Sequence, residues 1–440
     1  MKRLAYNLAL HCFAAPLLFS YFGPQILLKG RYKHSIKGKL GFLPTNITPK
    51  SPGRIRIWFH AVSVGEVVAL APLVEKTKLI IPQLDPLIST GTETGQKRAT
   101  ELIKSSESFF YMPLDFPYCV KRAVEIIKPD VFVMTETEIW PNLIHELKAA
   151  GAKIALMNGR ISDRSYPRYV KLKRFFKETL DSIDLFSMCS DEDALRIVQM
   201  GADPHKIKVS GNIKIDSALK TPDRAIETTL RKLYQLEESE DVLLAGSIHP
   251  GEDSIIVNSY KELIKKFPHL VLVIAPRHLE KMDSIISAIH KAGLQTPMLK
   301  SELDKGIKRN RNKIILIDQM GELFNAYSIA SVVFVGGSLV PKGGQNIIEP
   351  ASWSKPVIFG PSMEDFRDSS EILLRNEAAF RIKDVNQLIE RIDLLLSDSE
   401  VAHKMGNIAR NVLSAHLGSA EKSSEMLAEL AGLTVNSERN

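Results

Sequence analysis

The sequence predicts two α/β domains, each built on a parallel sheet that helices cover on both faces. Short apolar runs alternate with longer helical stretches along most of the chain, a pattern typical of doubly wound sheets. The length of 440 residues favours two domains over one. Hydrophobic residues make up 44% of the chain, which is enough apolar material for two cores.

An uncharged segment near the N-terminus predicts a membrane anchor helix. No charged residue lies between Leu4 and Leu28, and a spanning helix needs roughly 20 apolar residues. Five basic residues follow within 29–39, whereas only Lys2 and Arg3 precede the segment. Because positive charge favours the cytoplasmic side, we expect an uncleaved anchor with the rest of the chain in the cytoplasm. It would span the bilayer or lie in the interface; a helix packed on a domain and a cleaved signal peptide are the alternatives.

Charge and cysteine content narrow the class of protein only slightly. The net charge of +7 is compatible with nucleic acid, an anionic membrane or an acidic substrate. The three cysteines are far apart and form no CxxC pair, which argues against a disulfide framework or a zinc site. We therefore expect a reducing compartment.

The first half of the chain contains seven predicted strands. A helix is expected from about Gly65, and further helical patterns cover 118–128 and 166–180. After the last strand, residues 211–240 become polar and charged, which marks the interdomain boundary. The strands are expected at 55–62, 86–90, 109–114, 131–135, 154–158, 185–189 and 207–210.

The second half repeats the scheme and becomes purely helical after Val385, to about Leu433. Helices are expected at 252–267 and 279–292, and strands at 242–245, 270–275, 314–317, 332–335 and 356–359. The predicted parts are an anchor with a basic flank over 1–40, domains over 41–218 and 219–433, and a frayed tail over 434–440.

The most informative motif lies in the second half. The strand at 332–335 runs into two glycine pairs, 336–337 and 343–344, and then Asn346 and Glu349 open a predicted helix. Glycines allow backbone N–H groups to approach a ligand closely, and a helix N-terminus favours an anionic group. This pattern indicates a nucleotide site, with an ordinary strand–helix turn as the alternative.

Two other strand ends in this half carry candidate phosphate ligands. Met320-Gly321-Glu322 follows the strand at 314–317, and Pro276-Arg277 follows the strand at 270–275. A glycine at a helix start exposes backbone donors, and arginine can hold a phosphate with two hydrogen bonds. A surface position is the alternative for each. Walker A and Rossmann fingerprints are both missing from the sequence.

Carboxylates at two strand ends are the candidates in the first half. Ser63-Val64-Gly65-Glu66 follows the first strand, and Thr135-Glu136-Thr137-Glu138 follows the strand at 131–135. A carboxylate at such an edge could act as a general base. Both segments also match the spacing of a capping box, so Glu66 and Glu138 have a structural alternative, and Glu136 is favoured over Glu138 as the functional residue.

The remaining polar candidates are weaker. Lys214 lies after the last strand of the first half and is either a cleft residue or a solvated linker lysine. His60 is expected to be a core histidine. His249 and His278 are too isolated in sequence to predict a metal site.

Six segments taken together are similar to one family. They are HAVSVGEV at 60–67, TETEIWPN at 135–142, SGNIKID at 210–216, APRHLEK at 275–281, MGEL at 320–323 and GGQNIIEP at 343–350. In this order they closely resemble the Kdo transferases, the 3-deoxy-D-manno-octulosonate transferases of bacteria. The resemblance extends over nearly the whole chain.

The resemblance implies a GT-B fold, in which the two domains face each other across a cleft, with CMP-Kdo as donor and lipid IVA as acceptor. Glu66 matches the proton acceptor, and Glu136 and Lys214 match transition-state stabilisers. The matching CMP-binding residues are Pro276, Arg277, Met320, Gly321, Glu322, Asn346, Ile347, Ile348 and Glu349.

One base without a covalent nucleophile implies inversion by direct displacement. Cations and a helix N-terminus can neutralise the single phosphate of the leaving group without a metal. We expect no metal, no other cofactor and no nucleic-acid partner, and a location at the cytoplasmic face of the bacterial inner membrane. A nucleotide-sugar epimerase and an inactive membrane-bound binding protein are the alternatives. The number of Kdo residues added, the acyl preference and the oligomeric state do not follow from the sequence.

Overall fold

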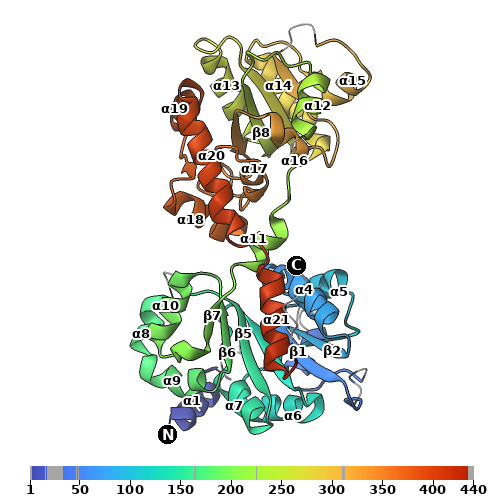
Figure 1. The fold of residues 1–440 in the computed structure, drawn as a ribbon, viewed down its shortest axis with the longest axis vertical. Helices are drawn as coiled ribbons and strands as arrows, with labels where there is room; N and C mark the ends of the chain where they lie inside the picture. Colours follow the sequence, from blue (N-terminus) through green and yellow to red (C-terminus); the bar gives the residue numbers. More distant parts are fainter. Residues whose placement is uncertain are drawn as a thin grey trace. The chain divides into compact units, whose positions relative to one another are not determined.

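The computed structural model describes residues 2–14, 16, 33–45, 47, 49–162, 165–223, 225–309 and 313–434. The chain divides into two compact units, and each contains one parallel sheet, as the sequence predicts (Figure 1). The first unit takes Met1–Ser217 together with Gly418–Asn440, and the second takes Ala218–Leu417.

The sheet of the first unit has seven parallel strands in the order β3-β2-β1-β4-β5-β6-β7. All seven were predicted. Strand order reverses between β1 and β4, and ligands of such sheets bind where the order reverses, at the carboxyl ends of the strands. The strands are β1 (Ile55–Ala61), β2 (Leu84–Thr90), β3 (Ser108–Tyr111), β4 (Val131–Thr135), β5 (Lys153–Gly159), β6 (Leu185–Met188) and β7 (Ile207–Val209).

Helices cover both faces of this sheet, which explains why its strands are apolar throughout. Along β1, Trp58 belongs to the core on one face, whereas Ile57 and Phe59 belong to the core on the other. The predicted helix over 166–180 is interrupted at Leu172 and forms two helices. One face is covered by α6 (Pro117–Ile127), α7 (Pro141–Ala149), α8 (Tyr166–Lys171), α9 (Lys173–Asp181) and α10 (Asp191–Met200), and the other by α4 (Val64–Ile80), α5 (Glu93–Leu102) and α21 (Ser419–Leu430).

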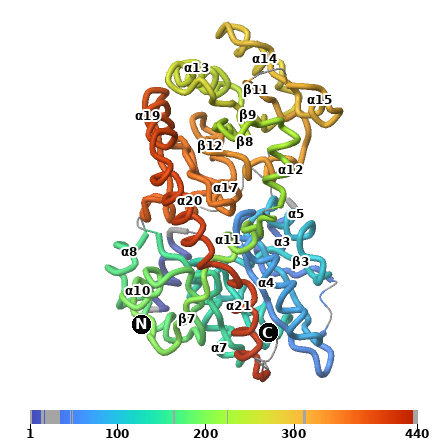
Figure 2. The backbone as a smooth tube through the Cα atoms, turned by 45° about the horizontal axis from the view of Figure 1, so that its top comes forward, coloured from blue at the N-terminus to red at the C-terminus, as the bar shows by residue number. Residues whose placement is uncertain are grey.

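The last helix, α21, corrects the predicted domain division. It lies beside α4 (Figure 2), and Leu427 belongs to the core of the first unit. The Asp216 carboxylate accepts hydrogen bonds from Gly418 N and Ala420 N, both at 3.0 Å, at the start of this helix. Assigning residues up to 433 to the second domain was therefore wrong from Gly418 onward, because helical periodicity does not indicate which sheet a helix covers.

The second unit contains a parallel sheet in the order β10-β11-β9-β8-β12-β13-β14. The order reverses between β8 and β12. The edge strands β10 and β14 were not predicted. The strands are β8 (Val242–Ile248), β9 (Val271–Pro276), β10 (Met298–Leu299), β11 (Ile314–Leu316), β12 (Val332–Val335), β13 (Val357–Phe359) and β14 (Ala379–Arg381).

The helices of the second unit enclose one main apolar core, which includes Ile256 and Ile392. The segment over 211–240, predicted as a polar boundary, contains α11 (Ile213–Ala218), which belongs to the first unit except for its last residue, and α12 (Ala225–Leu233), the first helix of the second unit. The others are α13 (Asp253–Leu263), α14 (Met282–Lys291), α15 (Lys300–Asp304), α16 (Leu323–Ala326), α17 (Ile348–Ser352), α18 (Arg367–Arg375), α19 (Val385–Ser397) and α20 (Ser399–Ser414).

The predicted membrane anchor is described only in its first part. The helix α1 (Lys2–Ala9) is followed by a short π-helical turn, Leu10–Ala14. Tyr6 donates to Asp115 Oδ2 at 2.9 Å, so α1 contacts the first unit. Residues 17–28 of the anchor, and 435–440 of the predicted tail, lie outside the described residues. Among the helices that are described, none combines the length and apolarity needed to cross a membrane.

Candidate functional site

Glu66 lies directly after β1, in the first turn of α4, whose N-cap is Ser63. Its Oε2 accepts from Val62 N at 2.8 Å and from Thr135 Oγ1 at 3.2 Å, and its Oε1 accepts from Ser63 Oγ at 3.0 Å. Only half of the capping box allowed by the sequence is formed, because Glu66 N donates to Ser63 Oγ at 3.4 Å but the Glu66 side chain does not accept from Ser63 N. A carboxylate has about four acceptor positions, so Glu66 keeps one position on Oε1 for a further donor.

The environment of Glu66 favours its protonated form more than water does. Only 7% of the residue is exposed, and this burial raises the pKa of its carboxyl group. The hydrogen bond from Val62 N opposes the rise, and the charge of Glu136 adds to it. A carboxylate with a raised pKa is a stronger base, which suits proton removal near neutral pH.

The structure brings Glu136 and Lys214 together at the same edge of the sheet. Glu136 follows β4 directly and has a left-handed backbone with φ of 57°, a conformation that is strained in non-glycine residues and is common at functional sites. Lys214 Nζ lies 2.6 Å from Glu136 Oε1. A Cβ atom on Gly65 would lie 3.8 Å from Lys214 Nζ, so the ammonium group is also next to the Glu66 turn. The alternative of a solvated linker lysine is therefore wrong.

Glu138 belongs to this cluster and does not cap a helix. The next helix, α7, begins at Pro141 and has no side-chain cap, so the predicted capping box at Thr135 and Glu138 was wrong. Burial, followed by the charge of Glu66, raises the pKa of Glu138 to about 7. Three carboxylates and one lysine thus gather where the strand order reverses.

We expect Glu138→Gln to stabilise the protein at alkaline pH. A carboxyl group whose pKa rises on folding, here from 4.5 to about 7, favours the folded state at low pH. That contribution is lost as pH rises through this range, and the cost of the buried charge is fully present above it. The free energy of unfolding of the variant should exceed that of the wild type by roughly 1–3 kcal/mol at pH 8 and by almost nothing below pH 4.5. Chemical denaturation at the two pH values tests this, and a difference independent of pH would contradict it.

His60 is a core histidine, as predicted. It is fully buried, and its Nδ1 lies 2.9 Å from Ser89 Oγ. Burial lowers the pKa of its ring to about 4. Its Nε2 has no hydrogen-bond partner within the part of the chain that the structure describes.

In the second unit, Arg277 follows β9 at the carboxyl edge of the sheet. Its backbone N donates to Ile248 O at 3.0 Å. The guanidinium group is exposed and has no partner among the described residues. His249 and His278, predicted to be isolated, have ring centroids 5.6 Å apart. Across the described ranges, no group of three or more His, Cys, Asp or Glu side chains is arranged to hold a metal.

The glycine pairs after β12 do not present their N–H groups to a ligand, contrary to prediction. Gly336 N donates to Gly246 O and Gly344 N to Gly337 O. The other two N–H groups are also used, because Gly337 N donates to Glu252 and Gly343 N to Ser362 Oγ. These glycines shape the loops and leave no amide free for a phosphate.

The free amides lie in the next segment. Within the described ranges, the backbone N–H groups of Gln345, Asn346 and Ile347 have no hydrogen-bond partner. Asn346 Oδ1 accepts from Ile348 N at 3.0 Å. The predicted helix is the five-residue α17, which begins at Ile348, and the Glu349 carboxylate in it pairs with Lys220 Nζ at 2.9 Å.

The segment Met320–Glu322 is held by a residue that sequence reasoning missed. Met320 is 67% exposed and Gly321 has φ of 89°. Glu322 Oε2 lies 3.3 Å from Lys300 Nζ, and Lys300, with a side chain only 7% exposed, also contacts Asp304 Oδ2 at 3.0 Å. No sequence signal distinguishes Lys300 from its charged neighbours. Because β9, β11 and β12 are parallel, the three predicted CMP-binding segments follow strands that end at one edge of the sheet.

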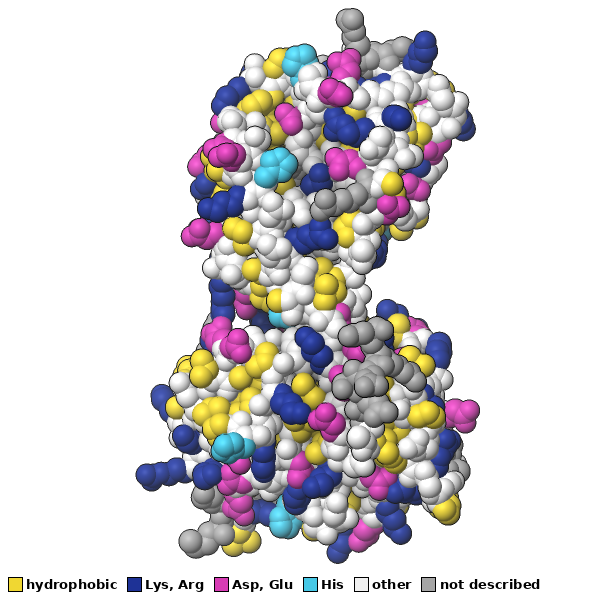
Figure 3. Space-filling view, viewed as in Figure 1, with side chains coloured by type: hydrophobic (Ala, Val, Ile, Leu, Met, Phe, Trp, Pro, Cys, Tyr) yellow, Lys and Arg dark blue, Asp and Glu magenta, His cyan; other side chains and the backbone are white. Residues whose placement is uncertain are grey.

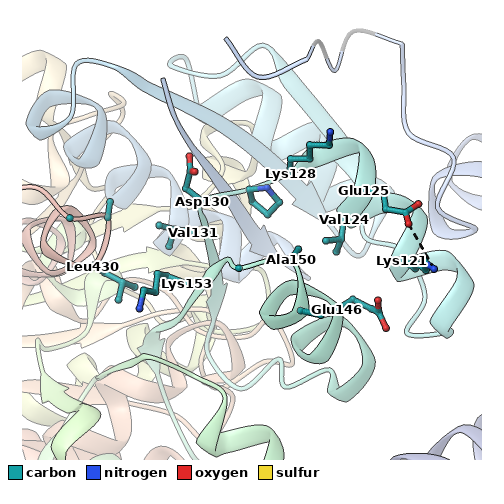
Figure 4. Close-up of a pocket in the computed structure, with 15 residues that line it drawn as sticks. Lys121, Val124, Glu125, Lys128, Asp130, Val131, Glu146, Ala150, Lys153 and Leu430 are labelled. Carbon is teal, nitrogen blue, oxygen red and sulfur yellow. Dashed lines mark ion pairs between the residues drawn. The ribbon is translucent and has the colours of Figure 1, made fainter. Parts of the chain in front are cut away.

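The hollow drawn in Figure 4 lies away from the predicted site residues. It has a volume of about 770 Å³ and lies at the opposite, amino-terminal edge of the first sheet. Its lining includes Lys128, Asp130 and Lys153 but none of the predicted site residues. On the face drawn in Figure 3, basic and acidic side chains are interspersed over both units and form no continuous basic patch.

Comparisons with known proteins agree with these motifs. The sequence model of the 3-deoxy-D-manno-octulosonic-acid transferase (kdotransferase) family matches residues 34–217. The 3-deoxy-D-manno-octulosonic acid transferase of Haemophilus influenzae is 32% identical over 94% of this chain and 95% of its own. The enzyme of the same name from Rickettsia felis is 31% identical over 80% of this chain and 75% of its own.

Solved structures of other proteins are similar in fold. UDP-GlcNAc 2-epimerase from Neisseria meningitidis bound to UDP-GlcNAc has a TM-score of 0.51 and 15% identity, covering 86% of this chain and 99% of its own. An identity this low shows the fold alone. The Haemophilus influenzae transferase is more than 30% identical over nearly all of this chain, so this protein belongs to the 3-deoxy-D-manno-octulosonic acid transferase family.

Proposed function

We propose that this enzyme transfers Kdo from CMP-Kdo to lipid IVA, with inversion and without a metal, at the cytoplasmic face of the bacterial inner membrane. The observation that carries the proposal is the buried Glu66 carboxylate, which has a raised pKa and one acceptor position left. In the reaction, this oxygen accepts the proton of the attacking sugar hydroxyl. The hydroxyl oxygen bonds to the anomeric carbon of Kdo as the bond to the CMP phosphate breaks.

Lys214 and Glu136 stabilise charge that develops during this displacement. The anomeric carbon becomes oxocarbenium-like as CMP leaves, and a carboxylate stabilises positive charge, whereas an ammonium group stabilises the leaving phosphate. Their ion pair of 2.6 Å fixes both groups before the substrate arrives, and preorganised charges of this kind lower the barrier most.

The second unit supplies groups suited to CMP. The exposed Arg277 guanidinium and the free N–H groups of residues 345–347 can bind a single phosphate. Glu349 can accept hydrogen bonds from ribose hydroxyls once its ion pair with Lys220 is broken. Neutralising one phosphate in this way requires no cation cofactor.

The membrane location is proposed from the N-terminal segment. Its uncharged stretch and the basic residues at 29–39 suit an anionic bilayer and a phosphorylated lipid acceptor. Leu4 and Leu8, four residues apart on α1, are 76% and 65% exposed, so one side of this helix is available to lipid.

The decisive test is mass spectrometry of lipid IVA after incubation with CMP-Kdo and the purified protein. A mass increase by one or more Kdo residues supports the proposal and counts the sugars added. Formation of free Kdo alone, or no product, contradicts it. Incubation with a UDP-sugar is the parallel test for an epimerase, and interconversion of that sugar would favour the alternative. The β- or α-configuration of the product, read by NMR, tests inversion.

A further inference from the structure

Glu252 is a buried carboxylate at the edge of the second sheet, and it is not one of the predicted site residues. It is 0% exposed and lies between β8 and α13. Its Oε2 accepts from His249 N at 3.0 Å and from Gly337 N at 2.7 Å. Its Oε1 accepts from Ser338 N at 3.1 Å and from Leu339 N at 2.9 Å. All four acceptor positions of the carboxylate are therefore occupied by backbone N–H groups.

These four bonds join two loops that come from different strands. His249 follows β8, and Gly337–Leu339 follow β12, so the carboxylate lies where the strand order of this sheet reverses. Ligands of doubly wound sheets bind at that point. Glu252 has no acceptor position left for a ligand and acts only on the loops around it.

The loop after β12 fits closely against this carboxylate. A Cβ atom on Gly336 would lie 2.5 Å from Ser247 O and 2.9 Å from Glu252 Oε2. Gly337 has φ of 66°, in the left-handed region. Gly336 is thus required because a Cβ atom would clash with the backbone of β8, and glycine is favoured at Gly337 because of its left-handed backbone.

Hydrogen bonds extend the effect of Glu252 to the segment with the free amides. Ser362 N donates to Ser338 O at 2.9 Å, and Gly343 N donates to Ser362 Oγ at 3.0 Å. Gly344 N donates to Gly337 O at 2.9 Å. The loop after β12, which is bound to Glu252, therefore also holds the second glycine pair, 343–344. This pair is followed directly by residues 345–347.

We infer that Glu252 is a positioning residue that shapes the donor-binding loops by binding four backbone N–H groups, without touching the donor. This inference rests on the proposed function for the identity of the ligand. The corresponding glutamate of the first unit differs in one respect. Glu66 also follows Gly at the end of the first strand of its sheet, but it keeps one acceptor position open, so one glutamate is free for chemistry and the other only holds loops.

Glu252→Gln tests the inference. The NH₂ group of glutamine cannot accept a hydrogen bond, so two of the four backbone N–H groups would face another donor. The loops should therefore shift. We expect the Kd for CMP and the KM for CMP-Kdo to rise about 10- to 100-fold, with little change in the KM for lipid IVA. The matched control is Glu262→Gln, which removes an exposed carboxylate from the adjoining helix α13 and should leave the Kd unchanged. A CMP affinity of Glu252→Gln equal to that of the wild type would overturn the inference.

Amide hydrogen exchange tests the same contacts without relying on CMP binding. In the wild-type protein, the amides of His249 and Gly337–Leu339 should be strongly protected. In Glu252→Gln, peptides that contain them should exchange at least tenfold faster, while peptides from α19 stay unchanged. Unprotected amides in the wild type overturn the inference even if the variant fails to fold. If the wild type binds no CMP but these amides are protected, the proposed function fails and the role of Glu252 in the loops stands.

Discussion

Replacing Glu66 with glutamine is expected to lower kcat by about 10²- to 10⁴-fold, the usual contribution of a general base. Glutamine has nearly the same shape and keeps one oxygen that can accept from Val62 N, but it cannot take up a proton. The Kd for CMP should not change, because the predicted CMP contacts belong to the second unit. Single-turnover transfer to lipid IVA measures the rate, and calorimetry measures the affinity.

The pH profile separates a catalytic role of Glu66 from a structural one. Burial raises the pKa of its carboxyl group, so wild-type kcat should rise with pH through a value above that of an ordinary glutamate, because only the deprotonated form accepts a proton. This acidic limb should be missing in Glu66→Gln. The control is Glu125→Gln, which removes a carboxylate that is 64% exposed on α6. Wild-type kcat in Glu66→Gln would exclude Glu66 as the base.

The sheets were largely predictable because buried parallel strands are apolar on both faces. Strands such as β4 and β12 are continuous apolar runs with turn residues on each side. The edge strands β10 and β14 are only two and three residues long, and Arg381 in β14 is exposed. Neither strand therefore forms an apolar run that can be recognised in the sequence. The position of α21 was unpredictable, since an apolar helix face fits either sheet.

The site was most predictable where a functional group lies within a few residues after a strand. Glu66, Glu136 and Arg277 fulfil this condition. Lys300 was not predicted, since its role depends on contacts with another loop. The partners of Glu252 in the β12 loop are 85 to 87 residues away in sequence. A usable signal existed for Glu252, because a Gly-Glu pair follows the first strand of both sheets.

Lys214→Met is the other change with a large expected effect. We expect kcat to fall by about 10²- to 10³-fold, which is the usual effect of removing one preorganised group that stabilises a transition state. Methionine fills a similar volume, so the loss is one of charge. The CMP affinity and the fold should be nearly unchanged. The control is Lys208→Met, which breaks an exposed ion pair of 3.0 Å with Glu429 in the same unit and should leave kcat unaltered.

A double-mutant cycle decides whether Lys214 acts on the reaction or only holds Glu136. Glu136→Gln leaves Lys214 in place without its ionic partner. If the ammonium group and the Glu136 carboxylate each stabilise their own charge in the transition state, both single variants lower kcat and the double variant is slower than either. Equal losses in both single variants and in the double variant would mean that the pair acts only as a unit. A kcat of Lys214→Met within threefold of the wild type would exclude the lysine from the chemistry. Its ammonium group lies 2.6 Å from the Glu136 carboxylate and beside the Glu66 turn. If the reaction develops charge there, removing the ammonium group must change the rate.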